Sequence, residues 1–151
     1  MTAPSRKGPW SEAELAAFLD ETRVPLRLAC NGSRGAPVLA SLWFVPEQGR
    51  LWCATQRSAR VVEHLRRDPA CAFEVAPETP PYRGLRGQGR ATLHDDRGES
   101  TLRILVERYL GDLDSEFARW LLARAENETA IEIEPETRVT WDFRARMSGA
   151  G

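Results

Sequence analysis

The chain has 151 residues, of which 42% are hydrophobic and 28% are charged, and its formal net charge is -1. This length suits one domain with a core of its own, and the slightly acidic balance argues against a general nucleic-acid binder, which would normally be basic. No apolar run approaches membrane-spanning length, and the polar first ten residues contain no apolar core of a signal peptide.

The three cysteines are Cys30, Cys53 and Cys71, and none belongs to a CxxC pair. A zinc site is therefore not expected, and because each cysteine lies in an apolar, strand-like run, we expect buried free thiols. An odd number of thiols without a disulfide framework is typical of a reducing compartment. We expect a cytoplasmic protein that binds no metal, membrane or nucleic acid.

The first predicted helix begins after Ser11, which forms a capping box with Glu14. Leu15, Phe18 and Leu19 then share one helical face, which indicates the side that packs on the core. A strand follows in which alternate residues, Leu26, Leu28 and Cys30, are expected to point inward.

The segment PVLASLWFV, residues 37–45, is apolar on both faces and is predicted as one strand. A strand that is buried on both sides needs a second covering surface, such as a subunit interface or a flat ligand. The turn signal PEQG and the segment RLWCAT then predict a hairpin.

The segment TQRSAR, residues 55–60, begins a short helix for which Ser58 is the predicted N-cap. Val61, Val62 and Leu65 form its predicted buried stripe, whereas His64 falls on the side expected to be exposed. The sequence RDP ends the helix, because the residue before a proline disfavours the helical region.

Two arginines, Arg57 and Arg60, lie at this helix start, where the helix dipole disfavours cations. Backbone N–H groups at a helix start form an anion site, to which Thr55 and Ser58 add hydroxyl donors. A bound phosphate would turn the unfavourable arrangement into a favourable one. The alternative is an ordinary capped helix with solvated arginines.

The long predicted strand RGLRGQGRATL contains Gly84, Gly87 and Gly89. Glycine weakens a strand interior unless a ligand or another backbone comes close. These residues would leave room for a planar ring edged by Arg83 and Arg86, or they mark a bulge in a strongly curved strand. Taken alone, the pattern favours the bulge.

Two helices and two closing strands follow, and Pro135 separates the strands. The two helical stripes consist of Leu102, Leu105, Val106 and Tyr109, and of Phe117, Trp120 and Leu121. With about seven strands and four helices joined by short connections, the pattern favours a mostly antiparallel closed sheet with peripheral helices. We expect one domain over residues 1–151, with flexible ends at 1–9 and 145–151.

The ordered segments GAPVLASLWFVPEQGRLWCAT, RSARVVEHLRRDPACAFEV and YRGLRGQGRATL resemble the pyridoxamine 5'-phosphate oxidase-like family. The resemblance covers residues 24–110, and the closing RVTWDF also fits. It implies a mainly β (α+β) fold, a six-stranded antiparallel split β-barrel with peripheral helices. It further implies a homodimer with FMN, or alternatively a deazaflavin coenzyme, between the subunits.

The resemblance also implies which residues bind the cofactor. Residues 39–41 would border the isoalloxazine ring, and Ala54 and Thr55 would border the ring and the ribityl chain. The start of the short helix would hold the phosphate, with added charge from two further arginines. The full set is Leu39, Ala40, Ser41, Ala54, Thr55, Arg57, Ser58, Ala59, Arg60 and Arg86.

The chain departs from the oxidase itself, whose basic residues fall where this chain has Val38, Trp43 and Ala59, and whose C-terminal basic substrate motif is missing. We therefore expect a flavin-dependent oxidoreductase that acts on an unknown small molecule other than the vitamin B6 substrate. The alternatives are a deazaflavin-dependent reductase and a non-catalytic cofactor or small-ligand binding protein. No acid–base pair is evident, so any redox chemistry is expected to come from the cofactor.

Overall fold

The computed structural model describes residues 3–149, which form eight strands and five α-helices. The strands are β1 (Ser5–Lys7), β2 (Leu26–Asn31), β3 (Pro37–Leu42), β4 (Val45–Glu47), β5 (Arg50–Gln56), β6 (Ala70–Val75), β7 (Arg83–His94) and β8 (Glu128–Asp142). The helices are α1 (Glu12–Glu21), α2 (Arg60–Arg67), α3 (Gly98–Leu110), α4 (Glu116–Leu122) and α5 (Arg144–Ser148), with two short 3₁₀ helices, η1 (Asp95–Arg97) and η2 (Ala125–Asn127).

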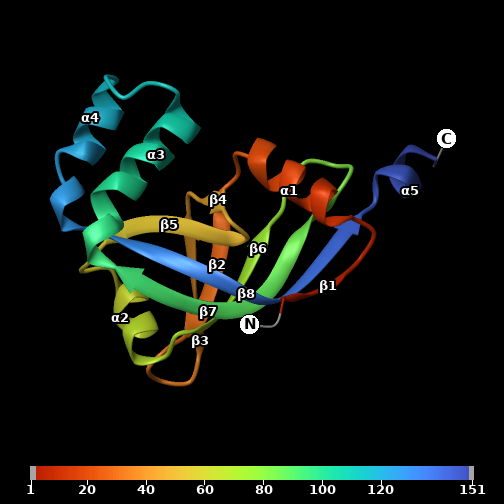
Figure 1. Cartoon of the computed structure of the whole chain (residues 1–151), viewed down its shortest axis with the longest axis horizontal. Helices are drawn as coiled ribbons and strands as arrows, with labels where there is room; N and C mark the ends of the chain where they lie inside the picture. Colours follow the sequence, from red (N-terminus) through yellow and green to blue (C-terminus); the bar gives the residue numbers. More distant parts are fainter. Residues whose placement is uncertain (1–2, 150–151) are drawn as a thin grey trace.

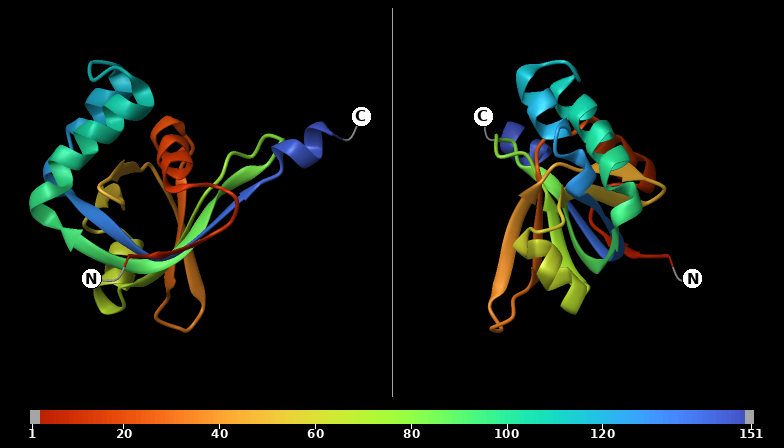
Figure 2. Two further views of the ribbon diagram at one scale, coloured as in Figure 1. Left: turned by 45° about the vertical axis from the view of Figure 1, so that its right-hand side comes forward. Right: turned by 90° about the vertical axis from the view of Figure 1, so that its left-hand side faces the viewer.

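All the strands belong to one sheet in the order β3-β2-β6-β7-β8-β5-β4, with β1 added in parallel beside β8. Every other pairing is antiparallel, which confirms a mainly antiparallel β fold with several helices. The sheet is strongly curved, with α3 and α4 near one end of the long β7–β8 ribbon and α5 at the other (Figures 1 and 2). Eight strands are present among the described residues where the family resemblance implied six, and the additional short ones are β1 and β4.

The two predicted closing strands are in fact one strand, β8, which runs for 15 residues through Pro135. The register shifts here, because Gln88 pairs with Thr137 and Gly89 pairs with Pro135, so that Glu136 is the extra residue of a bulge. A proline is tolerated at a bulge because its missing N–H is not needed there. A bulge is therefore present beside the glycines of β7, as predicted, but its extra residue belongs to β8.

The glycines of β7 allow close contact between protein groups. A side-chain carbon added at Gly87 would lie 2.1 Å from the Thr137 carbonyl oxygen, and one added at Gly89 would lie 2.2 Å from the Glu134 carbonyl oxygen. At Gly84 the indole of Trp141 would be only 2.7 Å away. The alternative interpretation of these glycines, a slot for a planar ring, is wrong because the protein itself fills the space.

The apolar segment 37–45, predicted as one strand, is divided between two. The first part, β3, ends at Leu42 and pairs with β2, whereas β4 begins at Val45 and pairs with β5. The predicted hairpin therefore joins only β4 and β5. Its loop consists of Gln48 and Gly49 with φ of 51° and 78°, which is the left-handed geometry that two-residue hairpin loops favour.

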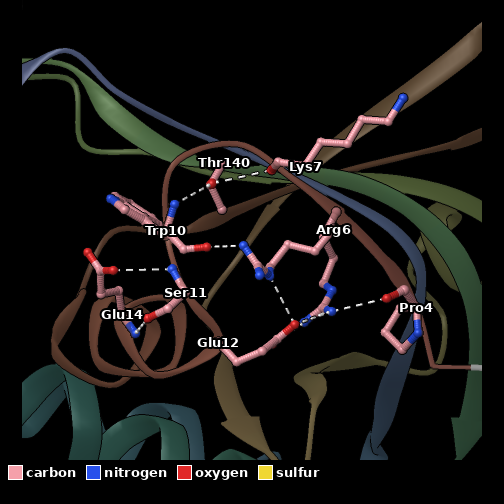
Figure 3. Close-up of polar contacts among 9 residues, drawn as sticks. Pro4, Arg6, Lys7, Trp10, Ser11, Glu12, Glu14 and Thr140 are labelled. Atoms are coloured by element: carbon pink, nitrogen blue, oxygen red, sulfur yellow. Dashed lines mark hydrogen bonds and ion pairs between the residues drawn. The ribbon is translucent and has the colours of Figure 1, made fainter.

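The main core lies between the sheet and α1. The capping box of Ser11 and Glu14 is present at the start of α1, with both of its hydrogen bonds (Figure 3). Leu15, Phe18 and Leu19 are buried as predicted. The inward alternation of β2 is also confirmed, because its alternate residues are buried from the first position onward. All three cysteines are buried and free.

A second, smaller cluster packs α3, α4 and η2 against the outer face of β5, around Leu102, Val106, Ala118 and Ala125. The stripe predicted for α4 is only partly buried, since Phe117 and Trp120 are 51% and 55% exposed. The prediction for α2 was wrong on one residue. Val61, Val62 and Leu65 are buried as expected, but His64 is buried with them.

Polar contacts hold the N-terminal segment, residues 4–14, against β8 (Figure 3). Arg138 donates hydrogen bonds to Glu12 at 2.8 and 2.9 Å, and Arg6 also pairs with Glu12. Trp10 receives a hydrogen bond from Arg6 at its carbonyl oxygen and donates its N–H to Thr140. Within the ends expected to be flexible, β1 and most of α5 are regular structure, while residues 1–2 and 150–151 lie outside the described residues. No helix among residues 3–149 is long and apolar enough to cross a membrane.

Candidate functional site

The predicted ring-contacting residues of β3 lie on the outermost strand of the sheet. Leu39 is 76% exposed and Ser41 is also exposed, whereas Ala40 points inward and packs against the main core. Only one face of this strand is therefore buried within the chain. The other face presents a large apolar side chain to its surroundings.

The end of β5 brings the predicted residues Ala54 and Thr55 close to Ser41, because all three line one pocket of about 290 Å³. Ala54 also packs against the smaller hydrophobic cluster under α3. The far wall of the pocket comes from α3, α4 and the segment around η2. The sheet and the helices thus enclose a space beside three of the residues predicted to contact the cofactor.

The helix start at α2 differs in detail from its prediction. The N-cap is Ala59, without a side-chain cap bond, so the prediction of Ser58 as N-cap is wrong. Ser58 lies one residue earlier and is exposed, and its hydroxyl makes no hydrogen bond with residues 3–149. The Ala59 N–H instead donates to the Gln56 carbonyl at 2.9 Å, which turns the chain from β5 into the helix.

The two arginines at this helix start have different surroundings. Arg57 donates its Nη2 to the Glu126 carbonyl oxygen at 2.9 Å, and its backbone N–H donates to the Asn127 carbonyl at 2.8 Å. Arg57 therefore links the end of β5 to η2 through these two hydrogen bonds. Arg60 is exposed and has neither a hydrogen bond nor an ion pair from its side chain to the part of the chain that the structure describes.

Arg86 lies far from the other predicted residues within one chain. It pairs with Val139 of β8, whereas Ala54 pairs with Ala130, nine residues earlier on the same strand. At about 3.3 Å per residue, this separation along β8 is about 30 Å. Arg86 stacks instead on Trp141, with its guanidinium carbon 5.0 Å from the ring centroid.

Sequence reasoning missed both charged residues of the pocket, Arg124 and Glu128. Glu128, at the start of β8, is only 6% exposed; its Oε1 accepts a hydrogen bond from Gln56 Nε2 at 2.9 Å, while its buried Oε2 has no partner. Burial raises the pKa of this carboxyl, against the opposing effects of Gln56 and Arg124. Arg124 stacks on Trp120, with its guanidinium carbon 5.1 Å from the ring centroid.

A sequence signal for Glu128 did exist. In β8 it alternates in phase with Ala130 and Glu132, so it faces the same side of the sheet as they do. The pattern of the strand does not by itself predict a helical layer over that side. The helices α3 and α4 cover the face and bury the carboxyl.

Three solved structures are similar to this chain in fold. A conserved hypothetical protein, Rv2991, from Mycobacterium tuberculosis is 25% identical with a TM-score of 0.75, over 97% of this chain and 93% of that one. A protein described as an F420 reductase is 22% identical with a TM-score of 0.68, over 80% and 92%. An FAD-binding protein from Mesorhizobium loti is 17% identical with a TM-score of 0.62, over 85% and 92%.

Among curated proteins, no significant relative of the sequence is found. A family model gives the assignment instead, and it covers both the sheet and the helical layer. The model described as pyridoxamine 5'-phosphate oxidase matches residues 11–142, from the cap of α1 to the end of β8. The chain therefore belongs to the pyridoxamine 5'-phosphate oxidase family.

Proposed function

We propose that the protein binds a flavin-type cofactor, FMN or a deazaflavin coenzyme, and uses it as an oxidoreductase acting on a small organic molecule. The observation that carries this proposal is the continuity of two features. The end of β5, at Ala54 and Thr55, lines the pocket, and the chain continues from there directly into α2. At the start of α2, Ser58 and Arg60 are exposed and can contact a ligand that extends out of the pocket.

The residues present fit such a group. Ser41, Ala54 and Thr55 carry small side chains, so a planar ring can lie against the two strands at this side of the pocket. The N-terminus of α2 carries a partial positive charge, and Arg60 and Ser58 add donors suited to a phosphate. When bound, the cofactor would supply the electron or hydride transfer, while this chain anchors the phosphate and orients the ring.

A second copy of the chain is part of the proposal. The exposed face of β3, with Leu39 at 76% exposure, offers an apolar surface that a partner subunit would cover. A cofactor lying against Ser41 and Ala54 would then be enclosed between two copies. Arg86, which is remote within one chain, would contact the cofactor only if the second copy presents it.

The alternatives differ in cofactor and in turnover. The fold likeness to the F420 reductase favours a deazaflavin, and the likeness to the FAD-binding protein favours a flavin. A non-catalytic cofactor or small-ligand carrier is the third possibility, because the described site contains no evident acid–base pair. A cofactor that binds but is never reduced by nicotinamide donors would support the carrier.

The test is a titration of the purified protein with FMN and with deazaflavin coenzyme, followed by intrinsic tryptophan fluorescence. Arg60→Ala is expected to weaken binding about tenfold to a hundredfold, because one charge-assisted contact contributes about 1.5–3 kcal/mol. Ser58→Ala should weaken it less. Arg66→Ala, an exposed arginine in the last turn of α2, is the control. Equal affinities for all variants, or no binding of either cofactor, would reject the proposed site.

A further inference from the structure

The pocket beside β5 continues away from the residues assigned to the cofactor and into the helical layer. Beyond Ser41 and Thr55 its lining consists of Leu102, Leu105, Phe117, Trp120 and Leu121, with Arg124 and Glu128 as charged groups. The whole pocket, including the part beside Ser41, Ala54 and Thr55, has a volume of about 290 Å³, slightly below the usual range for ligand pockets. It therefore suits a molecule of one or two rings.

The helical wall of this pocket is aromatic and partly open. Phe117 and Trp120 lie one turn apart on α4, with ring centroids 6.0 Å apart and planes within 12° of parallel. About half of each side chain is exposed. Large aromatic side chains exposed beside a pocket present flat faces on which a planar ligand can stack.

A cation lies directly against this aromatic wall. The Arg124 guanidinium stacks on Trp120 and forms no ion pair with any residue between 3 and 149. A guanidinium held on an aromatic face keeps its forked N–H donors available, and this fork matches the two oxygens of a carboxylate. Trp120 and Arg124 together therefore match an aromatic ring that carries an anionic group.

The buried end of the pocket carries one further polar group. Glu128 has one carboxyl oxygen bound by Gln56 and the other without a partner. A buried polar atom without a partner destabilises the fold, and a ligand that hydrogen-bonds to it removes that cost. A hydroxyl or ring nitrogen on the ligand would meet this requirement.

We propose that this pocket binds a small planar aromatic acid, of one or two rings, as the reactant that meets the cofactor. The ring would pack against the exposed parts of Phe117 and Trp120, the carboxylate would pair with Arg124, and a polar ring substituent would contact Glu128. The assignment as a reactant rests on the proposed function. The binding of the aromatic acid does not rest on it, because Trp120, Arg124 and Glu128 all belong to this chain and are separate from Ser58 and Arg60.

The test uses isothermal titration calorimetry of the full chain without cofactor, with 2-naphthoate and its neutral isostere 2-naphthamide as probes. We expect naphthoate to bind the wild-type protein at least tenfold more tightly than naphthamide. Arg124→Ala should abolish this preference, whereas Arg119→Ala, which changes an exposed arginine of α4 that does not line the pocket, should preserve it. No binding of naphthoate, equal binding of both probes, or equal effects of the two arginine changes would overturn the proposal.

Four further outcomes separate this proposal from the cofactor site. Arg60→Ala should leave naphthoate affinity unchanged while it weakens FMN binding. If naphthoate binds and neither cofactor binds, the proposed function is refuted and the aromatic-acid site is retained. If a cofactor binds and naphthoate does not, only the aromatic-acid site is refuted. If saturating FMN or deazaflavin displaces naphthoate competitively, the pocket holds the cofactor ring, and its assignment to a second reactant is overturned.

Discussion

Tyr109 of α3 stacks on Trp43, with ring centroids 4.9 Å apart and planes within 7° of parallel. The hydroxyl of the same tyrosine accepts a hydrogen bond from the Phe44 N–H at 3.2 Å and donates one to the Val24 carbonyl at 2.9 Å. Trp43 and Phe44 are the two residues between β3 and β4. The tyrosine therefore supports the break between these strands and holds Trp43 at the pocket.

Tyr109→Phe should keep the stacking and remove both hydrogen bonds. Since the hydroxyl is half-buried and joins two segments, we expect a loss of about 1–3 kcal/mol in the free energy of unfolding, measured by urea denaturation. Tyr82→Phe is the matched control, because Tyr82 is exposed and its hydroxyl has no partner among residues 3–149. Equal stabilities of the two variants would contradict the role assigned to the Tyr109 hydroxyl.

Gly87→Ala should destabilise the sheet itself. The added methyl group would lie 2.1 Å from the Thr137 carbonyl oxygen and 2.7 Å from the Phe73 ring, so β7 and β8 must separate locally. We expect a loss of about 1–3 kcal/mol or more, seen as a lower melting temperature. Gln88→Ala, at the adjacent exposed position, should leave it nearly unchanged. A stable Gly87→Ala protein with weaker cofactor binding would instead restore the ring-slot interpretation.

Asp142 should make the fold less stable in acid. Hydrogen bonds from Arg144 and from Trp10 Nε1 hold the pKa of this carboxyl well below its usual value of 3.8. Its contribution is therefore fully present above about pH 3.8 and is lost as the pH falls towards the folded-state pKa. Asp142→Asn should be less stable than wild type at pH 7. The difference in unfolding free energy should narrow below pH 3.8, and a gap that stays constant with pH would exclude this linkage.

The thiols should be unreactive in the native state. Burial raises the pKa of Cys30, Cys53 and Cys71, that of Cys71 to about 12, so little thiolate forms at pH 8. Ellman's reagent should detect three thiols after unfolding in urea and almost none before it. Only one thiol after unfolding would mean that Cys30 and Cys71, which lie directly opposite each other on β2 and β6, had oxidised to a disulfide.

Features set by local interactions could be predicted from the sequence. The capping box of Ser11 and Glu14 needs only a three-residue spacing, and the alternation in β2 needs only a period of two. The short helix after TQRSAR was also predicted from its residue types, whereas the phosphate site at its start stays a prediction. The N-cap is Ala59 because the Ala59 N–H donates to the Gln56 carbonyl oxygen and turns the chain at that residue. This is a backbone hydrogen bond, so no pattern of side chains predicts it.

Features set by distant parts of the chain could not be predicted in the same way. The break after Leu42 depends on Tyr109, which lies more than sixty residues away. The burial of His64 depends on strands that pack against α2, and that of Glu128 depends on a helical layer made by the intervening chain. In each case the local pattern is compatible with two environments, and tertiary contacts decide between them.

The strand β8 has a consequence for the order in which the protein can form. It pairs with β7 on one side, and with β5 and β1 on the other, yet it occupies residues 128–142 near the C-terminus. During synthesis, β5 and β7 must wait for most of the chain before their shared neighbour leaves the ribosome. The backbone N–H and C=O groups on the unpaired edges of both strands remain open during that interval. A chain truncated before residue 128 should therefore aggregate rather than form a smaller stable fold. During synthesis, β5 and β7 are the strands that a chaperone would have to protect until β8 emerges.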